Sequence, residues 1–124
     1  MSDSVTLDKA IKFALRIVKL YRYLTDEKKE YVLSKLVLIS GTHIAKFVRD
    51  ALAGEGRQNF GSDMFQAKKR AAETEFWLLI IYKGGYLDEK EYESINEDCL
   101  ELIRLTTSIS NTSRKRDEQP SKVG

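Results

Sequence analysis

The stretch "FWLLIIYKGGYLDEKEY", residues 76–92, determines which fold the chain is expected to adopt. Its apolar first half would suit a buried strand if it stood alone, but it follows a segment with helical periodicity and runs into Gly84 and Gly85. Glycine is favoured directly after a helix because it adopts the left-handed conformation at low cost. Asp88 then stands where a new helix needs an N-cap, with Glu91 three residues later as in a capping box. The stretch therefore predicts the end of one helix, a short turn and the start of the next.

Outward from this turn, apolar and small residues recur at steps of three and four in four successive segments. This spacing places them on one helix face, and no segment shows the period of two that is typical of a strand. The four series are Leu7, Ile11, Ala14, Val18 and Tyr21; Leu33, Val37, Ser40, Ile44, Phe47 and Ala51; Phe60, Met64, Ala67, Ala71, Thr74, Leu78 and Ile81; and Tyr92, Ile95, Cys99, Leu102, Thr106 and Ile109. Thr25, followed by two acidic residues, is expected to cap the second helix. The sequence therefore predicts an all-α fold, an antiparallel up-down-up-down four-helix bundle formed by residues 1–112.

The glycine-rich stretch "GEGRQNFG", residues 54–61, resembles a phosphate-binding loop at first sight. It lacks the glycine spacing of the dinucleotide-binding motif, and it follows a predicted helix where that motif follows a strand. We therefore expect Gly54 and Gly56 to end the second helix and Phe60 to be the first core residue of the third. A weaker alternative, a phosphate contact at the start of the third helix, would involve Arg57 and Asn59.

Composition limits the class of protein. The chain has 124 residues, of which 42% are hydrophobic and 32% are charged, as expected for one globular domain. The longest unbroken apolar run, Phe76 to Tyr82, has seven residues, whereas a membrane span needs about 20. The first residues lack the layout of a signal peptide, and the single cysteine cannot form an internal disulfide. We therefore expect a cytoplasmic protein without membrane contact.

The net charge of +2 resides entirely in the last twelve residues, 113–124. This segment has almost no apolar side chain to bury, which predicts a disordered basic tail. The tail either contacts nucleic acid or only aids solubility. Its charged residues are Arg114, Lys115, Arg116, Asp117, Glu118 and Lys122.

Residue types that carry catalysis or bind metals are scarce. The one histidine, His43, has no Glu three residues before it, as di-iron bundles require, and zinc sites need clustered Cys and His. We therefore expect no metal, no cofactor and no enzymatic activity. A nucleophilic pair of Cys99 and His43 stays possible by counting alone, but Cys99 lies on the apolar face of the fourth predicted helix, where an inert core thiol is favoured.

The first three predicted helices carry more apolar surface than a small bundle buries. Apolar residues cover roughly 220° of the first helix, whereas a bundle helix needs about 100°. Because a four-helix bundle encloses none of its helices on every side, part of this surface faces outward, and exposed apolar patches commonly mark interfaces. We expect self-association, with an interface formed by Phe13, Ile17, Leu20, Leu38, Phe76, Trp77 and Ile80.

Basic residues form the strongest polar pattern. Within the first predicted helix, a stripe of cations with an adjacent tyrosine lies opposite the apolar arc, and a second basic cluster lies on the third. Such stripes contact phosphate backbones, which release counterions on binding. The candidate nucleic-acid contacts are Lys9, Lys12, Arg16, Lys19, Tyr23, Lys68, Lys69 and Arg70. Two alternatives stay open: the stripe is a solvated face, or it pairs with the acidic fourth helix of its own or a neighbouring subunit.

The order and spacing of several motifs resemble a known family. From Ser40 to Leu78 the chain reads "SGTHIAKFVRDALAGEGRQNFGSDMFQAKKRAAETEFWL", which is similar to the bacterial 23S ribosomal RNA intervening-sequence proteins. The resemblance extends over about residues 10–110. Phe47, Lys46 and Arg70 depart from the family pattern of Asn, a small residue and Glu. The matching positions are Ser40, Gly41, Thr42, Ile44, Ala51, Phe60, Ala67, Lys69, Ala71, Glu73, Thr74, Trp77 and Leu78.

The resemblance implies an antiparallel four-helix bundle that is similar to the accessory protein of diversity-generating retroelements and assembles into a ring-shaped homopentamer. Some members are encoded inside insertions of the 23S rRNA gene, which implies a role with nucleic acid. The accessory proteins bind nucleic acid and a reverse transcriptase through basic ring surfaces. Two functions therefore stay in view: a homo-oligomer that binds RNA or DNA, and a protein–protein adaptor or scaffold with a protein partner and no nucleic acid.

Overall fold

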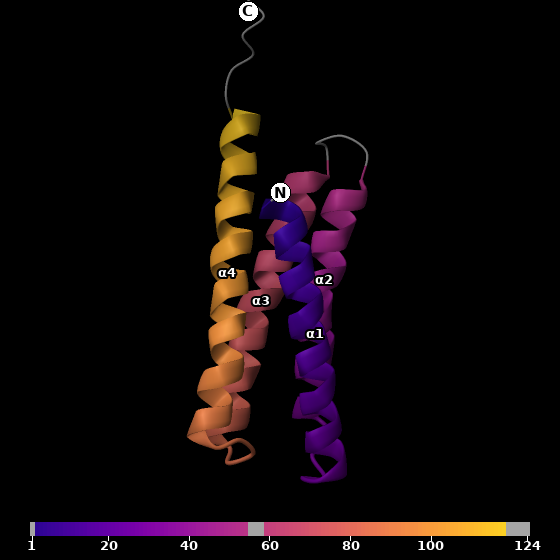
Figure 1. Cartoon of the computed structure of the whole chain (residues 1–124), viewed down its shortest axis with the longest axis vertical. Helices are drawn as coiled ribbons and strands as arrows, with labels where there is room; N and C mark the ends of the chain where they lie inside the picture. Colours follow the sequence, from indigo (N-terminus) through magenta and orange to yellow (C-terminus); the bar gives the residue numbers. More distant parts are fainter. Residues whose placement is uncertain (1, 55–58, 119–124) are drawn as a thin grey trace, which may run out of the picture.

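The structure is a computed structural model that describes residues 2–54 and 59–118, and this part of the chain contains four α-helices and no strand. The helices are α1 (Ser2–Asp26), α2 (Leu33–Ala53), α3 (Phe60–Lys83) and α4 (Glu89–Glu118) (Figure 1). Consecutive helices run in opposite directions and pack side by side, and α4 returns beside α1. The seam between α1 and α4 is the most sparsely packed, and α1 and α3 lie diagonally opposite across the core. The predicted all-α antiparallel four-helix bundle is confirmed.

The core faces of α2, α3 and α4 follow the predicted spacing, but the predicted face of α1 is wrong. The buried series of α1 consists of Ala10, Phe13, Ile17, Leu20 and Leu24, one residue out of phase with the expected one. Ile11 of the expected series is exposed. Two apolar series run side by side along α1, and the one that contains Phe13 and Ile17 fills the bundle.

Because the buried face of α1 differs from the predicted one, the interface role predicted for three of its residues is wrong. Phe13, Ile17 and Leu20 are at most 7% exposed, and they contact the other core residues of the same subunit. Side chains enclosed in this way cannot contribute the area of a subunit interface. The expectation that they form an oligomer interface is therefore withdrawn.

The turn between α3 and α4 has the predicted geometry. Gly85 has a φ of 89°, and its N–H donates to the carbonyl of Tyr82, while the N–H of Tyr86 donates to the carbonyl of Ile81. These two bonds form a Schellman motif, which satisfies the last carbonyl groups of α3. At the start of α4, the N–H of Glu91 donates to the Asp88 carboxylate (2.7 Å), and the Asp88 N–H donates to the Glu91 carboxylate (3.2 Å). The capping box is confirmed.

The turn between α1 and α2 is built differently from the prediction. Thr25 lies inside α1, and its hydroxyl donates to the carbonyl of Tyr21 (3.0 Å), so its predicted role as the cap of α2 is wrong. The carboxylate of Glu30 takes that role, because it accepts from the N–H groups of Val32, Leu33 and Ser34 at 3.2, 3.0 and 2.7 Å. The first N–H groups of a helix have no hydrogen-bond partner inside the helix, and the Glu30 carboxylate supplies one here.

The remaining boundaries agree in part. α2 ends at Ala53 with Gly54 as its C-cap, and α3 begins at Phe60, as expected. Gly56 and Arg57 lie outside the described residues. α4 continues to Glu118, beyond the predicted boundary at residue 112, and the rest of the predicted tail also lies outside the described residues. The disorder of this tail stays a prediction.

A close helix contact explains a glycine in the middle of α2. Gly41 is buried, and a Cβ placed on it would lie 2.8 Å from Cγ1 and 3.0 Å from Cγ2 of Ile17 on α1. One residue earlier, the hydroxyl of Ser40 accepts a hydrogen bond from Thr74 of α3 (2.9 Å) inside the core. Adjacent residues of α2 therefore fix its register against both neighbours.

Candidate nucleic-acid interface

The predicted basic stripe of α1 lies along the seam with α4. The ammonium of Lys9 is 2.7 Å from the carboxylate of Glu101, and the guanidinium of Arg16 is 2.8 Å from that of Asp98. Arg16 also donates to the backbone carbonyl and the hydroxyl of Ser94. The acidic helix of the same subunit therefore neutralises two of the four cations, as one of the alternatives expected.

The other two cations of the stripe remain available. Lys12 and Lys19 are exposed, and within the described residues they form no ion pair. Tyr23, one turn beyond Lys19, is half-buried, and the ammonium of Lys28 lies 5.7 Å from its ring centroid. Positive charge beside an aromatic ring thus persists at the C-terminal end of α1.

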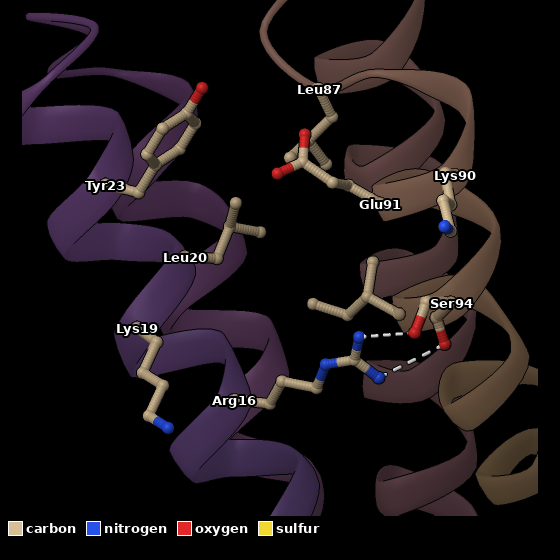
Figure 2. A pocket seen from close by; sticks show the side chains of 9 residues that line it. Arg16, Lys19, Leu20, Tyr23, Leu87, Lys90, Glu91 and Ser94 are labelled. Atoms are coloured by element: carbon tan, nitrogen blue, oxygen red, sulfur yellow. Dashed lines mark hydrogen bonds between the residues drawn. The ribbon is translucent and has the colours of Figure 1, made fainter.

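At that end, α1 and α4 form the walls of an open groove with a volume of about 550 Å³ (Figure 2). Leu20 and Tyr23 of α1 lie across from Leu87 and Glu91, and Arg16 reaches over the gap to Ser94. The complete lining is Arg16, Lys19, Leu20, Tyr23, Leu87, Lys90, Glu91, Ser94 and Ile95. The groove therefore joins an apolar floor to a charged rim.

Lys90 is a rim residue that the sequence reasoning missed. It stands on the acidic α4, and the sequence pattern alone assigns it no role. Since it lies one turn before Ser94, which bonds Arg16, its place beside the α1 stripe follows from the pairing of the two helices. The pairing of the basic stripe with the fourth helix was one of the two alternatives that the sequence left open. Following that alternative would have placed Lys90 beside the stripe.

The second basic cluster is separate. Lys68 and Lys69 lie near the exposed ring of Phe65, at 5.7 and 6.0 Å from its centroid. The guanidinium of Arg70 pairs with Glu73. Because α1 and α3 are diagonal in the bundle, the eight predicted contacts form two clusters and no continuous site within one subunit.

Large apolar side chains remain exposed at several places on the described surface. On α2 and α3 these are chiefly Ile39 (53% exposed) and Phe76 (52%), and on α1 Leu15 (60%) and Ile11 (44%). The hydrogen bond between Thr74 and Ser40 sets the antiparallel register of α2 and α3. In this register Ile39 lies at the same height along the bundle as the helical turn that contains Phe76. Of the predicted interface residues, Phe76 is exposed, and Leu38, Trp77 and Ile80 are half-buried.

Cys99 shows none of the features of a catalytic thiol. It is fully buried, and its thiol donates to the carbonyl of Ala71 (3.4 Å). Burial, with the charges of Glu75 and Asp98, raises the pKa of this thiol to about 12, so it stays protonated and weakly nucleophilic at neutral pH. His43 lies half-buried on α2 with its ring edge against Phe47. The geometry does not support a Cys–His nucleophile pair.

The described residues offer neither a metal site nor a membrane span. No group of three or more His, Cys, Asp and Glu side chains is placed to hold a metal ion in the ranges 2–54 and 59–118. None of the described helices combines the length and the apolar character needed to cross a membrane.

Comparison with known proteins identifies the family. The family model of the 23S rRNA-intervening sequence proteins matches residues 2–108, most of the chain. The chain belongs to this family. The resemblance predicted from the sequence motifs is thus confirmed, and the match covers all of α1 to α3 and most of α4.

A solved structure supports the family and the fold together. A protein from Bacteroides thetaiotaomicron, described as of unknown function and from the S23 ribosomal protein family, is 42% identical to this chain with a TM-score of 0.87. The alignment covers 90% of this chain and 99% of the other. The search of curated protein sequences gave no match. Membership of the 23S rRNA-intervening sequence family therefore supports the fold. It assigns no biochemical role, so the evidence for a role is the surface of the bundle.

Proposed function

We propose that this protein is a non-enzymatic bundle that assembles with copies of itself and binds structured RNA through its exposed basic residues. The observation that carries the proposal is the presence of two apolar surfaces that the bundle leaves uncovered. One lies on α2 and α3 around Ile39 and Phe76, and the other on α1 around Ile11 and Leu15.

The two surfaces differ in residues and in position. A subunit that joins its neighbours through two different patches makes head-to-tail contacts, and such contacts close into a ring when the rotation between subunits permits it. The family resemblance implies a ring of five. Contact between these surfaces would remove several large side chains from water, which stabilises association by about 25 cal/mol per Å² of apolar area.

Nucleic-acid binding rests on the cations that the bundle leaves unpaired. Lys12 and Lys19 on α1 and the Lys68–Lys69 pair on α3 are the available contacts, whereas Lys9, Arg16 and Arg70 are already engaged with carboxylates. A ring would repeat these lysines around its surface and so track a phosphate backbone. The family description, which refers to 23S rRNA, supports RNA as the ligand.

Charge reversal tests the RNA proposal with a matched control. We expect the double variants K12E/K19E and K68E/K69E each to lower the affinity for structured RNA at least tenfold in low salt, because each replaces two phosphate contacts by repulsion. The variant K35E/K83E changes the net charge equally at exposed lysines outside both clusters, and we expect a smaller loss. Wild-type affinity should also fall steeply with salt concentration.

The second candidate function is a protein–protein adaptor. The ion pairs of Lys9 and Arg16 with α4 favour this function, because they neutralise two of the cations that would otherwise contact RNA. Equal affinities of all three double variants, or no affinity of the wild type for RNA in low salt, would contradict RNA binding and favour the adaptor.

A further inference from the structure

We propose that the groove between α1 and α4 binds an unpaired nucleotide of single-stranded RNA, with the base against the ring of Tyr23 and the backbone phosphates on its two sides at Lys19 and Lys90. This inference rests on the proposed function, because it specifies which form of nucleic acid the α1 surface recognises.

The groove has the size and the lining that a planar ligand requires. Its volume of about 550 Å³ falls within the range of about 300–1,000 Å³ that is usual for small-molecule pockets. Leu20 and Ile95 are 7% and 5% exposed and form an apolar floor, to which Leu87 adds a half-buried side chain. The walls come from two helices whose seam is the most sparsely packed of the bundle.

Tyr23 provides a stacking surface at the groove wall. Figure 2 shows its ring on the α1 side of the gap, with Leu87 and Glu91 on the opposite side. Every nucleobase has a π-face, and stacking of unpaired bases on aromatic side chains is the usual way in which proteins hold single strands. In an RNA duplex the bases are stacked inside the helix and present mainly phosphates and 2′-hydroxyl groups, so a duplex cannot place a base in this groove.

The charges on the rim complement a phosphate. Lys19 and Lys90 are exposed and have no ion pair within the described part of the chain. The one acidic lining residue, Glu91, is engaged with the backbone N–H of Asp88 in the capping box. Arg16 is held by Ser94 and Asp98 and fixes the distance between the two helices at the other end of the groove. Lys19 on α1 and Lys90 on α4 thus place one positive charge on each side of the groove, where the phosphates that flank a bound base would lie.

The test compares a short fluorescent oligoadenylate with a duplex RNA of equal length, by fluorescence anisotropy in low salt. We expect Tyr23→Leu, which keeps an apolar side chain but removes the flat ring, to weaken oligoadenylate binding about 5- to 150-fold and to leave duplex binding unchanged. Tyr23→Phe keeps the ring and should bind like the wild type. Lys90→Glu should also weaken oligoadenylate binding, and Lys35→Glu, an equal charge change on α2, should do so less.

The results separate failure of the groove assignment from failure of RNA binding as a whole. The groove assignment fails if Tyr23→Leu and Lys90→Glu bind oligoadenylate like the wild type while K68E/K69E loses affinity, and RNA binding then stands without it. Equal losses on both RNAs, or a loss in Tyr23→Phe as large as in Tyr23→Leu, would also overturn it. A wild type that binds neither RNA but binds an acidic peptide would overturn both proposals. Because Lys90 is exposed, its variant tests the groove even if a Tyr23 variant unfolds, which circular dichroism would detect.

Discussion

Single residues set the distances between helices in this bundle, and Gly41 is the clearest case. The side chain of Ile17 occupies the space that any Cβ at position 41 would need, and a β-branched side chain on the neighbouring helix has little freedom to move away. A larger residue must therefore push α1 and α2 apart along their whole contact.

We expect Gly41→Val to lower the free energy of unfolding by about 1–3 kcal/mol, the usual cost of overpacking a core. Ala53→Val adds a branched side chain at the exposed last residue of α2, where only helix propensity changes, and should cost less than about 1 kcal/mol. Urea unfolding of both variants measures the difference. Equal losses would show that the contact between Gly41 and Ile17 is not tight.

At the scale of the element, the start of α2 depends on one carboxylate outside the helix. Burial acts to raise the pKa of Glu30, but hydrogen bonds from the N–H groups of Leu33, Ser34 and Val32 outweigh this effect, so the pKa lies below its ordinary value of 4.5. A carboxyl with a lowered pKa in the folded state stabilises the protein above its ordinary pKa, and this contribution is lost as the pH falls through the folded-state value.

We therefore expect Glu30→Gln to lower the melting temperature at pH 7, by an amount equivalent to about 0.5–1 kcal/mol. The difference from the wild type should shrink below pH 4.5 and vanish once Glu30 is protonated in the folded state. Glu27→Gln removes a nearby exposed charge and serves as the control. A difference between wild type and Glu30→Gln that does not change with pH would mean that the charge of Glu30 does not stabilise the start of α2.

The elements also show what the sequence could predict. The capping box at Asp88 and Glu91 and the glycine stop of α3 follow from residue type and spacing, because these bonds are local. The core faces of α2 to α4 were predictable because each of these helices carries a single dominant apolar series.

The core face of α1 was mispredicted because two apolar series run side by side, and local pattern does not tell which one fills the bundle. The cap by Glu30 was missed because it acts from two residues before the N-cap position. For the candidate site, the cationic stripe was visible in the sequence. Its pairing with Asp98 and Glu101 and the contribution of Lys90 depend on how α4 is rotated against α1, which only tertiary packing determines.

For the whole molecule, the subunit leaves apolar side chains of α1, α2 and α3 exposed to water, and the proposed self-association would cover them. The double variant Ile39→Glu with Phe76→Glu places charges on the α2–α3 surface without touching the buried core. We expect it to fold with unchanged helix content and to lose self-association, while Lys35→Glu, a charge change at an exposed polar position of α2, retains it.

The most direct test of the central claim is the mass of the wild-type protein by light scattering at micromolar concentration. We expect a single species at a multiple of the 14.2 kDa subunit mass, with five subunits as the number implied by the family resemblance. A mass of 14.2 kDa under the same conditions would contradict it.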